Sequence, residues 1–583
     1  MMIFIQRSLL SFFAKPIQPV LRGLFLPLLR LAIVIWVFEG FPGHGQEPQL
    51  DLPEASGLER APLPEDSGEK DLQAIPERKV MPQSAPVFEA PVMGPQEHVD
   101  FLKQKPDQQE RSAEVMAPFG PATWSWLPAQ VRDRLAKAPR APWREQADEV
   151  LIPRSQVKWP RYLSSLLKTP GWLELGGTFR VRYENKTNPS RKGEVGTADQ
   201  VALRTRVRLG VSGQIFRFLV EFQDSRAEFR DAGERLSTST QNTNNIQQLF
   251  GSATFQNVLG TGLRTDIHLG RLNLDFGRRR LVARNRFRNT TNAFDGAHWY
   301  VAHGRKWHVR AFLVEPVVIE IKGVNHFFGA DDTLFWGVSY ETQQNPRLRA
   351  NVYYFGLNDR PSDVTMLRQY STFGLRLSKS PQRGDFDYEG ETAWQVGTAG
   401  TSVGEKDHFA HMHHVEIGYT FKVGVTPRLV MQYDYASGTR NPGGSQHGTF
   451  DNLYGARNWE FTPTGIFGPF QRSNISSPGA RIFLHPLTRI PVTLMLKYRA
   501  WWLAQSRDAW VGSGLQDASG GSGNFLGQDI ELKIRGKFGP NFEISAGYDH
   551  FFKGSYIKNL AKIPGNPPAT DTDYFYLQTE IKF

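Results

Sequence analysis

From residue 172 to the C-terminus, the chain is written in segments of about ten residues that alternate apolar and polar side chains. The final segment shows the period, because its apolar face carries Phe575, Leu577, Thr579, Ile581 and Phe583. Lipid on one face and water on the other require a period of two, and closing the sheet leaves no unpaired edge. The pattern therefore predicts a β-barrel of the bacterial outer membrane.

The polar positions of these segments carry unusually many arginines. In 172–184, Arg180, Arg182 and Glu184 oppose apolar neighbours, and in 201–212 the ladder Arg204, Arg206 and Arg208 does the same. Arginine at every second position is incompatible with a packed soluble core, but it is expected where one strand face lines a water-filled pore.

Eighteen segments fit this pattern, and the gaps between them alternate long and short. They are 172–184, 200–212, 214–226, 246–257, 264–273, 293–303, 307–315, 333–342, 347–357, 369–379, 386–397, 408–422, 427–436, 478–485, 491–503, 527–538, 541–552 and 573–583. Long outer loops, tight inner turns and an even count place both termini in the periplasm. The predicted fold is an all-β, about 18-stranded antiparallel transmembrane β-barrel preceded by a largely disordered N-terminal region.

The first 165 residues read differently. Residues 1–45 have basic residues before the apolar run 31–38 and predict a signal peptide, with an uncleaved inner-membrane anchor as the alternative. Residues 46–165 are rich in Pro, Glu and Gln, which predicts a mostly disordered periplasmic extension. Peptidoglycan or periplasmic secretion proteins are its candidate partners, and a passive linker is the alternative. The barrel domain is expected to span 166–583.

Charge and cysteine content narrow the partners. The chain has no cysteine, which excludes disulfides and thiol chemistry, and its net charge of +11 suits anionic partners. The basic residues of the barrel region lie at alternate strand positions and in loops, without one dense patch. This distribution favours a charged lumen over a nucleic-acid surface, so no nucleic-acid partner is expected.

The stretch 269–299 reads LGRLNLDFGRRRLVARNRFRNTTNAFDGAHW. It resembles the alginate-export family of outer-membrane barrels through Gly270-Arg271, the Gly-x-x-Arg-Leu turn at 277–281, and Phe294-Asp295-Gly296. Segments across 170–583 are similar in a more diffuse way. The resemblance implies an eighteen-stranded barrel with an arginine-rich lumen that passes an anionic uronate polymer.

The residues and the resemblance together predict a passive, anion-selective channel for an acidic, alginate-like exopolysaccharide. Guanidinium groups suit carboxylates because they are planar, always charged and bind with two N–H groups. The expected selectivity residues are Arg180, Arg182, Arg204, Arg206, Arg208, Arg271 and Arg280, followed by Arg310, Lys497 and Arg499. The acids expected to hold them are Glu184, Glu221, Glu389, Glu391 and Asp434. For any one of these, a purely structural ion pair is the alternative.

Other functions remain as alternatives. A porin for uptake of small anionic solutes could use the same wall. An enzyme with its site on the outer loops would need clustered acids, histidine and serine at one rim, which the sequence lacks, so neither catalysis nor a cofactor is expected. A structural anchor acting through residues 46–165 is a further possibility.

An exporter needs a gate, and no predicted inner turn is long enough to plug the lumen. The candidates are the outer loop 437–477, the basic loop 274–292 and the N-terminal extension. The histidines at 408, 411, 413 and 414 lack a fixed third metal ligand, so no metal is expected. Trp501 or Trp510 could stack on a sugar, but membership of an aromatic girdle at the membrane interface is the simpler interpretation.

Overall fold

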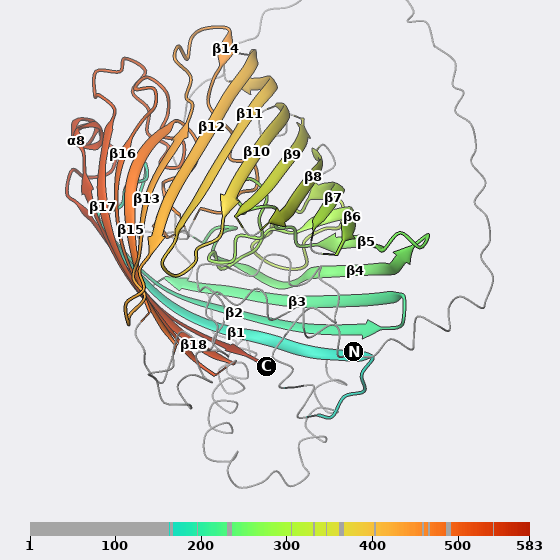
Figure 1. The fold of residues 1–583 in the computed structure, drawn as a ribbon. Helices are drawn as coiled ribbons and strands as arrows, with labels where there is room; N and C mark the ends of the chain where they lie inside the picture. The colour runs from blue at the N-terminus through green and yellow to red at the C-terminus, as the bar shows by residue number, and fades with distance from the viewer. Residues whose placement is uncertain are drawn as a thin grey trace, which may run out of the picture. The chain divides into compact units, whose positions relative to one another are not determined.

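The computed structural model describes Leu163 and residues 167–583, except 195, 230–235, 305, 330–332, 346, 361–366, 402–403, 458–459, 464–466, 486–490 and 540. The predicted signal peptide and all of the predicted extension but Leu163 lie outside the described residues. The barrel domain, by contrast, is described almost throughout (Figure 1).

Within the described residues, nineteen strands and a six-residue helix form, and eighteen of the strands make the barrel wall. The wall strands are β1 (Leu173–Thr187), β2 (Thr197–Ser212), β3 (Phe216–Phe229), β4 (Asn242–Val258), β5 (Leu263–Leu272), β6 (Phe294–His303), β7 (Trp307–Pro316), β8 (Thr333–Asn345), β9 (Leu348–Asp359), β10 (Arg368–Lys379), β11 (Phe386–Thr401), β12 (Gly404–Thr420), β13 (Arg428–Ala436), β15 (Ile475–Leu484), β16 (Val492–Trp502), β17 (Phe525–Phe538), β18 (Phe542–Lys553) and β19 (Thr572–Lys582). In outer loops lie β14 (Gln446–His447), which pairs with β12, and α8 (Ser555–Leu560).

The wall closes on itself. Each wall strand pairs antiparallel with its neighbours in chain order, and β1 pairs with β19 from Thr178 opposite Lys582 to Thr187 opposite Asp573. Closure satisfies the backbone hydrogen bonds of every wall strand on both sides, which a sheet in lipid requires. The predicted eighteen-stranded closed antiparallel barrel is confirmed.

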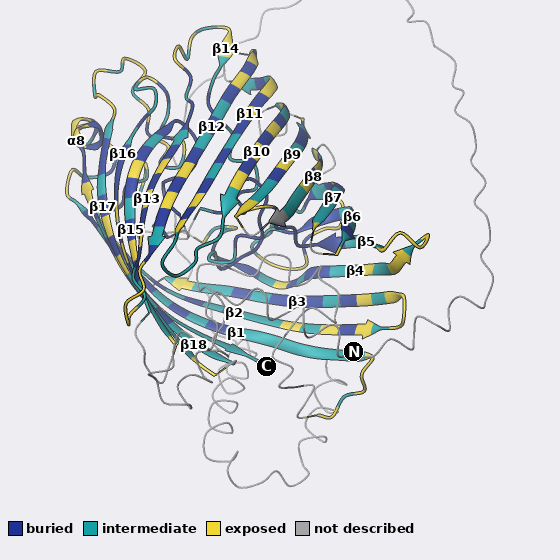
Figure 2. Ribbon diagram, viewed as in Figure 1, coloured by how far each residue is buried: buried dark blue, intermediate teal, exposed yellow. Residues whose placement is uncertain are grey.

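Burial alternates along the strands, as Figure 2 shows. In β13, Leu429, Met431 and Tyr433 are exposed on the outside, whereas Gln432 and Asp434 between them are buried inside. The outer face is therefore apolar and the inner face polar, as the period of two predicts. In the described part of the chain, no helix is both long and apolar enough to cross a membrane.

The two ends of the barrel differ. Tight turns lie at the end where β1 starts and β19 ends; one example is Gly213, whose N–H donates to the carbonyl of Phe216 at 2.7 Å. Long loops lie at the other end, among them 437–474, 503–524 and 554–571. Short turns on the periplasmic side and long loops outside are the bacterial outer-membrane arrangement, with both ends of the barrel domain in the periplasm.

Two of the outer loops fold back inside the barrel. We call residues 274–292 the basic loop and residues 437–474 the long loop, which is three residues shorter than predicted because β15 starts at Ile475. The two loops pair with each other: Val282 bridges to Tyr454, and the N–H of Ala283 donates to the carbonyl of Tyr454 at 3.1 Å. Both predicted gate loops thus lie within the lumen.

Candidate functional site

All ten predicted selectivity cations lie on the inner side of the wall or in the basic loop. Eight of them are buried, and Arg206 and Arg208 are partly exposed. Their neighbours Val207 and Leu209 face outward and are about 40% exposed. The predicted alternation therefore correctly placed the charged residues on the lumen face and the apolar residues on the lipid face.

The arginines of β1 and β2 hold the basic loop. Arg180 donates to the backbone carbonyls of residues 286–288 at 3.0–3.3 Å and to Oδ1 of Asn289 at 2.9 Å. Arg204 donates to two of the same carbonyls at 3.0 and 3.1 Å, and Arg182 donates to the middle one. The partners of these three guanidinium groups are mostly neutral carbonyls, and a carboxylate, Glu184, lies 3.7 Å from Arg182.

The next two members of the ladder differ in their partners. Arg206 donates to Oε1 of Gln223 at 2.8 Å and to Oγ1 of Thr291 at 3.3 Å, so it also touches the basic loop. Arg208 forms an ion pair with Glu221 at 2.6 Å. The ladder thus passes from loop contacts to a wall ion pair as β2 descends toward the periplasm.

The motif glycines allow β5 to pair closely with β4, and β6 with β7. Gly270 has φ +127° and Gly296 has φ +146°, and the two face each other across the strands. A Cβ atom at either position would lie 2.3 Å from a backbone carbonyl oxygen of the adjoining strand. Only glycine adopts this backbone without strain, which explains the two glycines of the motif.

Beside these glycines, the Gly-Arg and Phe-Asp-Gly motifs meet in one ion pair. Arg271 and Asp295 form two parallel hydrogen bonds of 2.7 and 2.8 Å, and both side chains are buried. Arg310 on β7 donates to the backbone carbonyl of Asp275 at 2.7 Å and so fixes the entry of the basic loop. These contacts shape the wall and the loop start.

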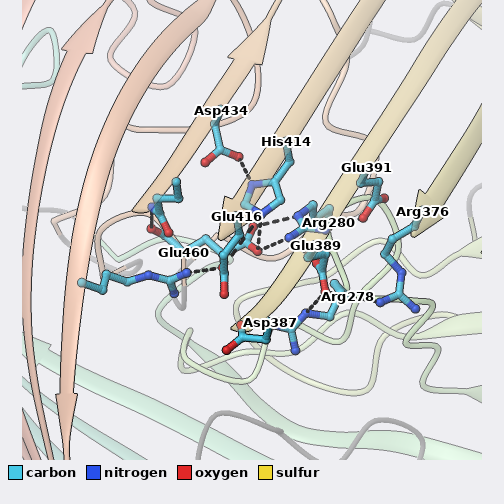
Figure 3. A network of polar contacts seen from close by, with 12 residues as sticks. Arg278, Arg280, Arg376, Asp387, Glu389, Glu391, His414, Glu416, Asp434 and Glu460 are labelled. Atoms are coloured by element: carbon cyan, nitrogen blue, oxygen red, sulfur yellow. Dashed lines mark hydrogen bonds and ion pairs between the residues drawn. The ribbon is translucent and has the colours of Figure 1, made fainter. Parts of the chain in front are cut away.

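Arg280, at the tip of the basic loop, is the centre of a buried network (Figure 3). It pairs with Glu389 at 2.6 Å, with Glu391 on the same strand, and with Glu460 of the long loop. Burial by itself would lower the pKa of Arg280, but Glu389 and Glu391 raise it above its ordinary value. Arg472 also pairs with Glu460, although burial lowers the pKa of Arg472 to about 10. Both loops and the wall are joined through these charges.

His414 and Asp434 extend this network on the wall. Nδ1 of His414 lies 2.9 Å from Oδ1 of Asp434, and Arg499 donates to Oδ2 of Asp434 at 2.7 Å. Potential metal-ligand atoms of Glu389, His414 and Glu460 lie within 4.8 Å of one another. Both glutamates already neutralise Arg280, so the arrangement is chemically an ion-pair network.

Lys497 sits in a second group of charges. Its Nζ lies 2.7 Å from Glu531 and 3.2 Å from Asp529, and it donates to the backbone carbonyl of Phe461 at 2.6 Å. Lys497 therefore links the wall to the long loop, as Arg280 does from the other side.

Aromatic packing anchors the long loop. Phe470 stacks on Trp501 with ring centroids 4.1 Å apart, and it also contacts Trp510 at 5.2 Å and Phe551 at 5.1 Å. Trp501 and Trp510 are almost completely buried. Phe470 covers both tryptophans, so in this conformation they cannot stack on a sugar, and that interpretation is wrong. Because both are buried inside the barrel, they do not belong to an aromatic girdle on its outer surface either.

The histidine pair on β12 points away from the lumen. His411 and His413 share the outward strand face, with ring nitrogens 3.0 Å apart and Tyr435 stacked beside them. His408 and His414 point inward instead.

Below the network, a cavity of about 130 Å³ lies in the periplasmic half of the lumen. Its wall is made by the periplasmic ends of β9 to β13 and β15 to β17, and Arg278 reaches it from the basic loop. Its cationic lining residues are Arg278, Arg349, Arg376, Lys379, Arg428, Arg481, Lys533 and Arg535. Its acidic lining residues are Asp387, Glu389, Glu416 and Glu531. We call this cavity the vestibule; eight cations against four acids give it a positive excess.

Several of these residues were not predicted. Arg376 lies between the exposed Leu375 and Leu377, and Glu416 lies between the exposed Val415 and Ile417, so the alternation contained the signal for both. Glu460 had no such signal, because it lies in a long loop without periodicity.

A closed barrel of this size, apolar outside and cationic within, is a channel of the bacterial outer membrane. The family model for alginate export matches residues 171–564. The chain therefore belongs to the alginate export family, and the resemblance read from 269–299 is confirmed. Fold and family are those of a transport channel.

Comparison with curated proteins finds no match. Three Pseudomonas aeruginosa proteins are among the solved structures to which the chain is similar. OccK8 (OprE) has 13% identity and a TM-score of 0.45, with 70% of this chain and 98% of that chain covered. OccD3 (OpdP) has 11% identity and a TM-score of 0.47, with 71% and 91% covered. OccK3 (OpdO) has 15% identity and a TM-score of 0.45, with 73% and 99% covered. Likeness at this level carries no argument about function.

Proposed function

We propose that this protein is a passive, anion-selective channel through which an acidic, alginate-like exopolysaccharide leaves the periplasm. The observation that carries the proposal is the vestibule, where eight cationic side chains face four acidic ones at the periplasmic entrance of the lumen. Family membership supports an acidic polymer as cargo, and the protein acts without catalysis.

The charge pattern suits a moving polyanion. A polymer that enters the lumen gives up part of its hydration, and fixed cations along the path compensate for that loss. Many moderate sites permit transit, whereas one tight site would stop it. Acids such as Glu389 and Glu416 moderate the field, because each pairs with arginines that line the vestibule.

The described conformation is closed in this proposal. The basic loop and the long loop meet at Arg280 and Glu460 in the middle of the lumen, directly above the vestibule. The long loop is held by the aromatic packing around Phe470, and the basic loop by the wall arginines together with its buried Phe276 and Val282. We assign gating to the basic loop because it covers Arg180 and Arg204, so its departure would open a path past these wall arginines.

Uptake of small anionic solutes is the second candidate. The observation that favours it is the pair of loops inside the lumen, because permanently inward loops would leave room only for small solutes. The two functions differ in the size of the largest anion that passes.

Efflux from proteoliposomes tests the proposal. Full-length protein is reconstituted, and the release of trapped fluorescent uronate oligomers is compared with that of neutral glucose oligomers of equal length. We expect faster release of the uronate oligomers. Release of monomeric uronate alone would favour the uptake porin, and faster release of the neutral oligomer would refute both functions.

A matched variant locates the effect. Lys533→Gln removes one vestibule charge and keeps the side chain of similar length. Lys537→Gln makes the same change further along β17, outside the residues that line the vestibule. We expect slower uronate efflux in the first variant only.

A further inference from the structure

Lys533 differs from the other cations that line the vestibule. The other seven each form an ion pair with a carboxylate: Arg278 with Glu389, Arg349 and Arg376 with Glu341, Lys379 with Asp385, Arg428 with Asp387, Arg481 with Glu416, and Arg535 with Glu543. Among the residues that the structure describes, Lys533 has no carboxylate partner, and the nearby Glu531 on the same strand is paired with Lys497 at 2.7 Å. The half-buried ammonium group of Lys533 is therefore available to a carboxylate that enters the vestibule.

Beside Lys533, the wall of the vestibule is apolar. In the register of the sheet, Lys533 lies opposite Met495 on β16, and Met495 lies opposite Phe483 on β15. Both apolar side chains line the vestibule. Cross-strand neighbours on one face of a sheet lie about 5 Å apart, so one ligand can touch the ammonium group and the apolar pair together.

Loop packing does not explain these apolar residues. Inward positions of a water-filled barrel favour polar side chains. The large apolar cluster inside the barrel includes the loop residues Phe276 and Phe470, so it serves to hold the inward loops. Val430, Phe483 and Met495 form a separate, smaller cluster that contains no residue of either loop. An apolar step in a cationic wall therefore suits a ligand that is itself partly apolar.

A uronate unit combines the two features that this part of the vestibule offers. Its carboxylate is attached directly to a pyranose ring, and the faces of that ring carry C–H groups. Lys533 attracts the carboxylate as a point charge. Contact of the C–H groups with Met495 and Phe483 removes apolar surface from water. An inorganic anion gains only the first of these contributions.

We propose that Lys533, Met495 and Phe483 form a subsite that binds one uronate unit, with the carboxylate on Lys533 and the pyranose ring on the apolar pair. The subsite distinguishes acidic sugars from other anions of equal charge. This inference rests on the proposed function and adds the chemical feature by which the vestibule recognises its cargo.

Block of the chloride current by sugar acids tests the subsite. Full-length protein is recorded in planar bilayers, and glucuronate or gluconate is added to both chambers. Both are six-carbon monoanions, but gluconate is an open chain without a pyranose ring. We expect glucuronate to halve the current at an about fivefold lower concentration, the factor that burial of one apolar ring face provides. Equal half-blocking concentrations would overturn the inference.

Two variants separate the charge from the ring contact. Lys533→Gln should weaken the block by both anions, whereas Phe483→Leu keeps an apolar side chain without a flat ring and should weaken the block by glucuronate only. The matched control is Phe250→Leu, the same change at a buried phenylalanine of β4 outside the vestibule lining, which should retain the preference for glucuronate. A folded Phe483→Leu barrel with an unchanged preference would show that the ring contact plays no part.

Met495→Gln covers the case in which Phe483→Leu fails to fold. It keeps the length of the side chain and removes its apolar character, so the preference for glucuronate should fall here too; an unchanged preference would count against the subsite. The reversal potential in the same recordings separates the two proposals. An anion-selective wild type without a preference for glucuronate refutes this inference alone, whereas a cation-selective wild type refutes the proposed function itself.

Discussion

Replacing Arg280 by glutamine tests how the basic loop is held in place. Arg280 is the guanidinium that joins the loop tip to Glu389 and Glu391 on the wall and to Glu460 in the long loop. Glutamine keeps part of the hydrogen bonding but removes the charge, and it leaves three buried carboxylates without this partner.

The size of the effect follows from the burial of the network. Removing one partner of a buried ion pair costs about 3–5 kcal/mol, because the remaining charge stays uncompensated. Once the loop leaves and water enters, the three carboxylates are hydrated and no longer need this partner. The substitution therefore raises the free energy of the closed state and leaves that of the open state nearly unchanged. Since about 1.4 kcal/mol is tenfold, the ratio of closed to open channels should fall by about 10²–10⁴.

Single-channel recording in planar bilayers measures this ratio directly. We expect Arg280→Gln channels to occupy the high-conductance level most of the time. Arg284→Gln is the matched control, because Arg284 pairs at 2.9 Å with Asp275 inside the same loop and that pair moves with the loop. Gel migration with and without heating confirms that each variant barrel is folded. A folded Arg280→Gln barrel with unchanged occupancy would refute the assignment of Arg280 as the tether of the loop.

Three further predictions concern the motif, the long loop and the vestibule. Gly270→Ala should lower the yield of folded barrel in refolding assays, because its Cβ would meet the carbonyl of Leu249, whereas Gly251→Ala meets nothing within 4 Å and should refold normally. Phe470→Ala should destabilise the barrel by about 3–5 kcal/mol, measured as a lower temperature of heat modification; an unchanged temperature would contradict the aromatic anchor. Lys533→Glu should lower anion selectivity in 0.1 M salt and have little effect in 1 M salt, where screening is stronger.

The wall could be predicted from the sequence because lipid enforces its pattern. All eighteen predicted segments correspond to wall strands, and the main errors lie at their outer ends. β4 and β12 begin four residues earlier than predicted, at Asn242 and Gly404. Beyond the lipid both strand faces meet water, so the apolar alternation that marks a strand is lost.

The interior could be predicted only in part. The alternation indicated that Arg180 and Arg204 face the lumen, but it could not show that carbonyls of the basic loop are their partners. The inward path of both loops depends on contacts between residues far apart in the chain, such as Arg280 with Glu460. Trp501 shows the same limit, because a loop residue, Phe470, decides whether it is covered.

The reversal potential of the full-length protein in a planar bilayer, under a tenfold gradient of KCl, tests the central claim most directly. A lumen with a cationic excess should give a potential of the sign set by chloride, and the selectivity should weaken as total salt rises. A potential of the sign set by potassium would contradict a cationic passage and the channel function derived from it.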